Sequence, residues 1–147
     1  IFGGGGNAST SRYRTIDMIT TSSKGNAIDD GDLQHKLTEA AAASNSVRGI
    51  WAGGGPLFLS DIQYRTLSSS GNAEYFGDLT VGRRSVGSGA STQTRMVIGG
   101  GRTPTILNTI DFVTIASAGN ANDFGDLSEP RRGMGALSDC HGGLGGF

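Results

Sequence analysis

The sequence has little of several features that define common classes of protein. It contains one cysteine and three prolines in 147 residues. A single cysteine cannot close a disulfide within the chain, so the fold must depend on packing and hydrogen bonds. Twelve basic and thirteen acidic residues leave a formal charge of −1, which gives no field for attracting nucleic acid or an anionic membrane. We therefore expect neither nucleic acid binding nor membrane insertion.

Long apolar runs and clusters of reactive side chains are also scarce. No stretch approaches the roughly 18 apolar residues of a membrane span, and no signal-peptide pattern opens the chain. Two histidines and one cysteine supply too few ligands for a structural zinc site. These observations predict a soluble protein with no catalytic residues and no cofactor.

What the sequence does contain is one pattern that occurs three times. Gly-Asn-Ala starts at Gly25, Gly71 and Gly119, and Gly-Asp-Leu follows six residues later in each case, so both motifs step by 46 and then 48 residues. Periods of this length are typical of repeats that bury their apolar faces against their neighbours. We place the approximate repeats at 1–49, 50–96 and 97–142 in a single region, 1–147, with 143–147 starting a further unit.

Glycine doublets and leucines mark equivalent positions of the repeats. The doublets are expected at crowded strand ends, where a side chain would clash, and the leucines that end Gly-Asp-Leu are expected to be buried. Trp51 occupies a repeat position held elsewhere by Phe2 and Ile98, which indicates a core residue. The markers are Gly3, Gly4, Gly53, Gly54, Gly99, Gly100, Gly145, Gly146, Leu33, Leu79 and Leu127.

Short apolar runs bounded by turn-forming residues predict strands. The segments 48–51, 95–98 and 109–115 are rich in β-branched or other apolar residues and too short for typical helices. Together with the polar return segments they predict four short strands in each repeat, which is the content of a β-propeller blade. The alanine-rich segment 37–44 differs, because its composition favours a bend or a partial helix.

The order of these motifs resembles the kelch repeat. Val97-Ile98-Gly99-Gly100 is similar to the end of a blade's second strand, and Pro130-Arg131-Arg132-Gly133 is similar to the opening of the next blade. The segment 110–127, which runs from Ile-Asp-Phe-Val-Thr-Ile to Asp-Phe-Gly-Asp-Leu, resembles kelch-like repeat proteins of tailed bacteriophages, notably marine ones. This resemblance implies a propeller in a virion, as part of a tail, fibre or appendage.

Three repeats are too few for a closed propeller, which has about four to eight blades. We therefore expect either further repeats outside this chain or completion by oligomerisation, for example two sets of three. Identical subunits that assemble through one repeated contact are common among symmetric oligomers. A homo-oligomer in contact with other virion proteins is the predicted state.

The acidic turn of the third repeat offers the best candidates for an ion site. Asn120, Asp123 and Asp126 place oxygen donors around a glycine, and calcium accepts such ligands. The spacing differs from that of a calcium loop, and turn hydrogen bonds explain the same residues. We therefore predict no metal and retain these three residues as weak calcium candidates.

The arginine pairs Arg83-Arg84 and Arg131-Arg132 also recur between repeats. They are predicted to line one rim or to link blades through carboxylates such as Asp78 and Asp126. The resemblance to phage kelch-like proteins implies a non-enzymatic structural or adhesive component of a virion, with a host-surface glycan as a further expected partner. The alternatives are a cellular kelch-type interaction module, cytoplasmic or extracellular, and the propeller domain of a carbohydrate-active enzyme.

Overall fold

The computed structural model describes residues 1–7, 11–87 and 89–138. All regular secondary structure in these ranges is β-strand, and the strands form three antiparallel sheets. The predicted all-β class is therefore confirmed. The markers Gly145 and Gly146, and the unit expected at 143–147, lie outside the described residues. Within those residues, no helix is long and apolar enough to span a membrane.

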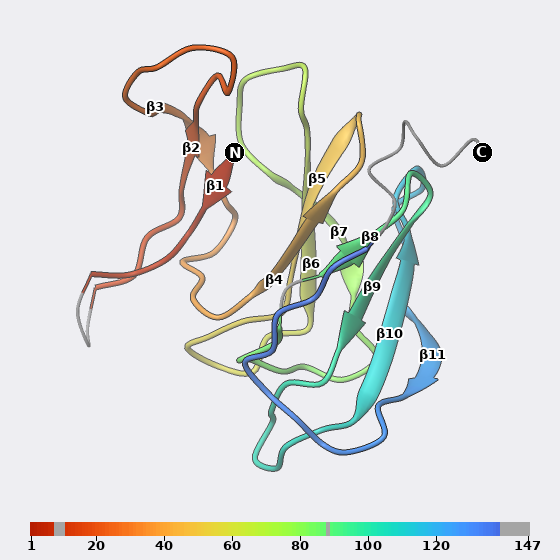
Figure 1. Ribbon diagram of the computed structural model, residues 1–147. Helices are drawn as coiled ribbons and strands as arrows, with labels where there is room; N and C mark the ends of the chain where they lie inside the picture. The colour runs from red at the N-terminus through yellow and green to blue at the C-terminus, as the bar shows by residue number, and fades with distance from the viewer. Residues whose placement is uncertain (8–10, 88, 139–147) are drawn as a thin grey trace.

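Each sheet is built from consecutive strands of the chain, and Figure 1 shows the three sheets following one another across the molecule. The first sheet contains β1 (Phe2–Gly3), β2 (Thr15–Met18) and β3 (Ile28–Asp32). The second contains β4 (Ala41–Ser44), β5 (Arg48–Ala52), β6 (Asp61–Thr66) and β7 (Glu74–Asp78). The third contains β8 (Ala90–Ser91), β9 (Arg95–Gly99), β10 (Thr109–Thr114) and β11 (Asn122–Asp126). The predicted four strands are thus present in the second and third sheets, and the first has three in the described residues.

The three sheets share an irregularity at the same place. The register shifts between the last two strands of each sheet, next to Ile16, Ile62 and Ile110. A β-bulge of this kind bends the strand and increases its local twist. Its recurrence at equivalent positions indicates that the sequence repeats fold as equivalent units.

The alanine-rich segment 37–44 is not helical, so the expected bend or partial helix is wrong. Ala41–Ser44 forms β4, which pairs along its length with β5. Alanine has a high helix propensity, but pairing and burial in the sheet outweigh it here. Small side chains also suit this position, because a Cβ atom on Gly89, which directly precedes β8 of the third sheet, would lie 3.1 Å from the Ala43 Cβ atom. The strand therefore lies close to the neighbouring unit.

The hydrophobic core lies between sheets. One buried cluster joins apolar residues of the second and third sheets, including Ile62 and Phe76 on one side and Val113 and Ile115 on the other. A second cluster joins the first sheet to the second and includes Trp51, which is buried as the sequence predicts. Each sheet therefore buries its apolar surface against its neighbour, which is the arrangement expected of stacked repeats.

The glycine doublets occupy crowded turns, with a register that differs from the sequence markers. The pairs that adopt left-handed backbone in all three units are Gly4–Gly5, Gly53–Gly54 and Gly100–Gly101. Gly3 and Gly99 instead end β1 and β9. In the first and third repeats the left-handed pairs therefore begin one residue after the sequence markers, because runs of three or four glycines do not specify a register.

Crowding at the first glycine of each left-handed pair is the same in every unit. A Cβ atom at Gly4, Gly53 or Gly100 would lie 2.8, 2.7 or 2.4 Å from a backbone carbonyl oxygen of the return segment. Those oxygens belong to Leu37, Arg83 and Arg131 respectively. Positive φ and close backbone contact both require glycine at these positions.

Candidate functional site

The contact between the second and third sheets is built from the two repeated tripeptides. The backbone N–H of Asp78 donates to the Asn120 side-chain oxygen at 3.1 Å. The Asp78 carbonyl accepts from the backbone N–H of Ala121 at 2.8 Å. The Gly-Asn-Ala turn of one repeat therefore satisfies both backbone groups of the aspartate in the preceding Gly-Asp-Leu.

The same contact joins the first sheet to the second. The Asp32 N–H donates to the Asn72 side-chain oxygen at 3.0 Å, and the Asp32 carbonyl accepts from the Ala73 N–H at 2.8 Å. A Cβ atom on Gly31 would lie 2.3 Å from the Gly71 carbonyl oxygen, so the docked turn leaves no space for a side chain. We call this repeated contact the junction: the Gly-Asp-Leu of one sheet with the Gly-Asn-Ala of the next.

The leucine of each Gly-Asp-Leu is buried where a following sheet docks on it and is more exposed where none does. Leu33 and Leu79 are buried, as the sequence predicts. Leu127 is only half-buried, and it belongs to the third sheet, which has no following sheet among the described residues. The burial of this position therefore depends on a neighbouring unit.

We call the contact between the first and second sheets the first junction and the contact between the second and third sheets the second junction. A buried ion pair stabilises the second junction. The carboxylate of Asp111 in β10 accepts from the Thr80 backbone N–H at 3.0 Å and from its hydroxyl at 2.7 Å. The Arg83 guanidinium lies 2.8 Å from the same carboxylate, and both side chains are fully buried. Burial lowers the pKa of Arg83 below its ordinary value, while the negative charge of Asp111 acts in the opposite direction.

The sequence predicted arginine links between blades but named the wrong carboxylates. The partner of Arg83 is Asp111 of the next sheet, and the Asp78 carboxylate instead accepts from the Ser60 and Tyr75 hydroxyls. Arg131 contacts the Ser128 hydroxyl at 2.9 Å, not Asp126. A long-range partner of this kind leaves no local signal in the sequence, so repeat spacing alone could not identify it.

The first junction has different side chains at the equivalent positions. Gln63 replaces Asp111, and its side-chain oxygen accepts from the Gln34 N–H at 2.7 Å. Leu37 replaces Arg83 and is buried. A separate buried ion pair, Asp30 with Arg65, crosses this junction.

Two tyrosines donate hydrogen bonds to carboxylates on the second sheet. The Tyr64 hydroxyl lies 2.7 Å from Glu74, and the Tyr75 hydroxyl lies 2.5 Å from Asp78. These hydrogen bonds are the main reason why the pKa of each tyrosine is raised above its ordinary value. Both phenols are therefore held in the protonated form that can donate.

The weak calcium candidates make turn contacts. Asn120 accepts from the Asp78 N–H, as described above, and the Asp123 carboxylate accepts from the Gly125 N–H at 3.1 Å. Asp126 is exposed at the end of β11. In the part of the chain that the structure describes, no three His, Cys, Asp or Glu side chains are grouped closely enough to hold a metal ion.

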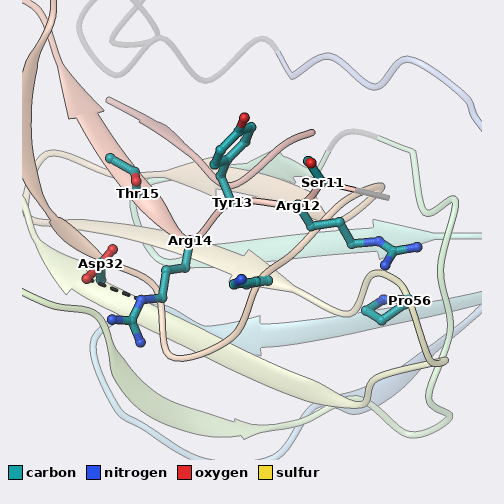
Figure 2. Close-up of a pocket in the computed structure, with 8 residues that line it drawn as sticks. Ser11, Arg12, Tyr13, Arg14, Thr15, Asp32 and Pro56 are labelled. Atoms are coloured by element: carbon teal, nitrogen blue, oxygen red, sulfur yellow. Dashed lines mark ion pairs between the residues drawn. The ribbon is translucent and has the colours of Figure 1, made fainter. Parts of the chain in front are cut away.

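A surface cleft of about 550 Å³ lies beside the first junction. Figure 2 shows Arg14 pointing toward Asp32, at an Nε–Oδ2 distance of 3.3 Å, and Pro56 near Arg12. The lining residues are Ser11, Arg12, Tyr13, Arg14, Thr15, Asp32, Lys36 and Pro56. Three cations and one carboxylate line it, so its chemistry suits an anionic group. The residues of this cleft follow no motif spacing, so no signal in the sequence indicated it.

Comparison with known proteins gives no family assignment. The chain matches no protein-family model, and no curated protein has significant sequence similarity to it.

Proposed function

We propose that this protein is a non-enzymatic structural component in which propeller-like repeats form a rigid scaffold for assembly. The observation that carries this proposal is the position of its buried polar groups. The ion pairs Arg83–Asp111 and Asp30–Arg65 both cross from one sheet to the next. Buried charges are costly to desolvate and strongly constrain geometry once paired. Here they fix the arrangement of neighbouring units.

The proposed setting is the virion of a tailed phage, in a tail, fibre or appendage. The support for this setting is the resemblance of segment 110–127 to kelch-like repeat proteins of such phages. Repeated β-units with extensive junctions suit a particle component, which must hold its shape while it contacts neighbouring subunits. Copies of the same chain and other virion proteins are the proposed partners.

An adhesive role is the second part of the proposal. The cleft beside the first junction presents the cationic side chains of Arg12, Arg14 and Lys36 at the surface. Arginine binds carboxylate and sulfate-like groups through paired hydrogen bonds. We propose that an acidic glycan on the host surface is the ligand of this cleft.

Purified particles provide the test of the virion assignment. Antibodies raised against the chain should label intact particles in electron micrographs, and mass spectrometry of the same particles should detect its peptides. Recovery only from the particle-free cell fraction would overturn the virion role and favour a cellular interaction module.

A glycan-binding assay tests the adhesive role. A carboxylated or sulfated glycan should bind the chain, and the double variant Arg12→Ala, Lys36→Ala should bind that glycan about tenfold more weakly. Equal binding by this variant and the parent would exclude the cleft as the glycan site.

A further inference from the structure

The outer sheets carry the two separate halves of the junction. On the third sheet, Gly125-Asp126-Leu127 is the counterpart of the Gly-Asp-Leu that docks inside the chain. On the first sheet, Gly25-Asn26-Ala27 is the counterpart of the Gly-Asn-Ala that docks on it. A Cβ atom on Gly125 would meet no described heavy atom within 4 Å, whereas one on Gly31 would lie 2.3 Å from the docked Gly71 carbonyl oxygen. Ala27 is exposed, whereas its docked counterparts Ala73 and Ala121 are buried. Both halves are therefore accessible.

The apolar residues beside these halves are exposed where their internal counterparts are buried. Phe76 is 2% exposed in the second junction, whereas Phe124, at the same repeat position, is 55% exposed. Val113, which shares a buried cluster with Phe76, is 1% exposed, and its first-sheet counterpart Ile19 is 38% exposed. Burial of such a pair on association would be favourable.

The exposed phenylalanine is held in the orientation of its buried counterpart. Phe124 packs edge-to-face on Phe112 with ring centroids 6.0 Å apart. Phe76 packs in the same way on Tyr64, at 5.7 Å. The third sheet therefore presents an already ordered aromatic side chain, which lowers the entropic cost of docking.

The polar residues complete the match. The repeat spacing places Ser128 at the position of Thr80 and Arg131 at the position of Arg83 on the third sheet. On the first sheet it places Asp17 at the position of Asp111. Ser128 and Arg131 are exposed and Asp17 is half-buried, while the residues of the internal pair, Arg83 and Asp111, are completely buried. The two outer faces thus hold the hydroxyl, cation and carboxylate of the second junction.

The residue types also select which faces can meet. We call the face of a sheet that contacts the preceding sheet its receiving face. On the receiving face of the second sheet, Gln63 stands at the position of the carboxylate Asp111, and Arg65 stands at the position of the apolar Val113. Docked on a face of that kind, Arg131 would have no carboxylate and Phe124 would meet a cation. Asp111 and Val113 of the third sheet are already buried in the internal junction. Among the undocked faces of the described residues, the first sheet offers a carboxylate, Asp17, together with an apolar residue, Ile19, so charge and shape both favour it.

We propose that the third sheet of one copy docks on the first sheet of a second copy through a junction like the internal ones. In this contact Arg131 and Ser128 bind Asp17, Phe124 packs on Ile19, and Asn26 accepts from the Asp126 backbone N–H. The inference deepens the assembly part of the proposed function and does not depend on the virion setting. The contact is head-to-tail, so two copies can close a ring at both ends or many copies can form a filament.

Charge reversal tests this contact in the 147-residue chain. Sedimentation velocity and native mass spectrometry should show concentration-dependent self-association of the parent chain. Asp17→Arg and Arg131→Asp should each weaken it by roughly 30-fold or more, because each leaves like charges facing in the contact. The double variant Asp17→Arg, Arg131→Asp restores opposite charges and should recover most of the association. Arg132→Asp makes the same charge change one residue away, and it should associate like the parent.

The outcomes separate the proposal from its alternatives. A closed dimer and a growing filament both contain the proposed contact, and the measured mass distinguishes them. A parent chain that stays monomeric up to its solubility limit would overturn the proposal, as would failure of the double variant to recover association. Circular dichroism of each variant should match the parent, since these side chains are exposed or half-buried and outside the internal junctions. The particle-labelling experiment above is independent of these results, so failure of one proposal is distinguishable from failure of the other.

Discussion

The two internal junctions use the same backbone contact with different side chains. Asn72 and Asn120 accept from aspartate N–H groups at 3.0 and 3.1 Å. Beside them, the first junction combines Gln63 with Leu37, whereas the second combines Asp111 with Arg83. The carboxylate and the cation therefore change together between junctions. The backbone contact positions the sheets, and the side chains determine which sheets match.

Removal of the carboxylate from the second junction should have the largest effect on stability. Asp111→Ala leaves the fully buried Arg83 guanidinium without its counter-charge and Thr80 without its acceptor. We expect a loss of about 3–5 kcal/mol in the free energy of unfolding. Gln63→Ala at the equivalent position removes one neutral acceptor and should cost about 1–3 kcal/mol. Urea unfolding of both variants at one protein concentration measures the difference.

A double variant that places the first junction's residue types in the second junction provides the matched control. Asp111→Gln combined with Arg83→Leu introduces the two neutral residues that the first junction has at these two positions, Gln63 and Leu37. Replacement of a buried ion pair by a packed neutral pair is often close to neutral for stability. The double variant should therefore recover most of the stability lost in Asp111→Ala. Equal losses in Asp111→Ala and Gln63→Ala would contradict the distinction between the junctions.

The shared backbone contact should give a smaller effect that is equal at both junctions. Asn72→Ala and Asn120→Ala each leave one aspartate N–H without its side-chain acceptor. We expect each to lower the free energy of unfolding by about 1 kcal/mol. Asn26→Ala is the control, because no described sheet precedes the first one, and it should leave the stability of the dissociated chain unchanged. Unequal effects of Asn72→Ala and Asn120→Ala in thermal or urea unfolding would show that the two junctions are not equivalent.

The sequence predicted the strands well, because the features that indicate a strand are local. The β-branched run that contains Ile110 and Val113 forms β10, since alternation and turn residues are visible within a few positions. The alanines of β4 were misjudged, because sheet pairing outweighs helix propensity. The left-handed pairs begin at Gly4 and Gly100 and not at the markers Gly3 and Gly99. A run of identical glycines does not indicate which of its members adopts the left-handed backbone.

The junction and the cleft could be predicted only in part. The tripeptides were evident as repeats, but nothing local indicates that Asn120 caps the N–H of Asp78 across 42 residues. The Arg83–Asp111 pair likewise needs the packing of two sheets before the residues become neighbours. The cleft depends on Arg12 and Pro56 from different units, and neither residue stands out by its spacing. Contacts between units follow from tertiary packing, which repeat spacing alone does not determine.

The smallest predicted effect concerns how each junction aspartate is held. The Asp32 carboxylate pairs with the Arg14 guanidinium, while the Asp78 carboxylate accepts a hydrogen bond from the Tyr75 phenol. That hydrogen bond raises the pKa of Tyr75 above 10.0. A raised pKa stabilises the fold at every pH below the unfolded value, and the contribution is lost as pH rises through the folded pKa. Above that pH, tyrosinate also repels Asp78. The second junction should therefore weaken first at alkaline pH.

Tyr75→Phe tests this alkaline sensitivity by removing the titrating group. The stability difference between the parent and the variant should be constant from about pH 8 to about pH 10 and should decline at higher pH. Tyr75 is half-exposed, so the difference should be small. Tyr64→Phe removes a similar hydrogen bond to Glu74, which lies outside the Asp78 contact, and serves as the matched control. Limited proteolysis measures how well the Asn120 turn is protected from cleavage. If only the second junction is sensitive to alkaline pH, this turn should be cleaved faster at alkaline pH in the parent chain and not in Tyr75→Phe. Equal alkaline loss at the Asn72 turn would remove this distinction between the two junctions.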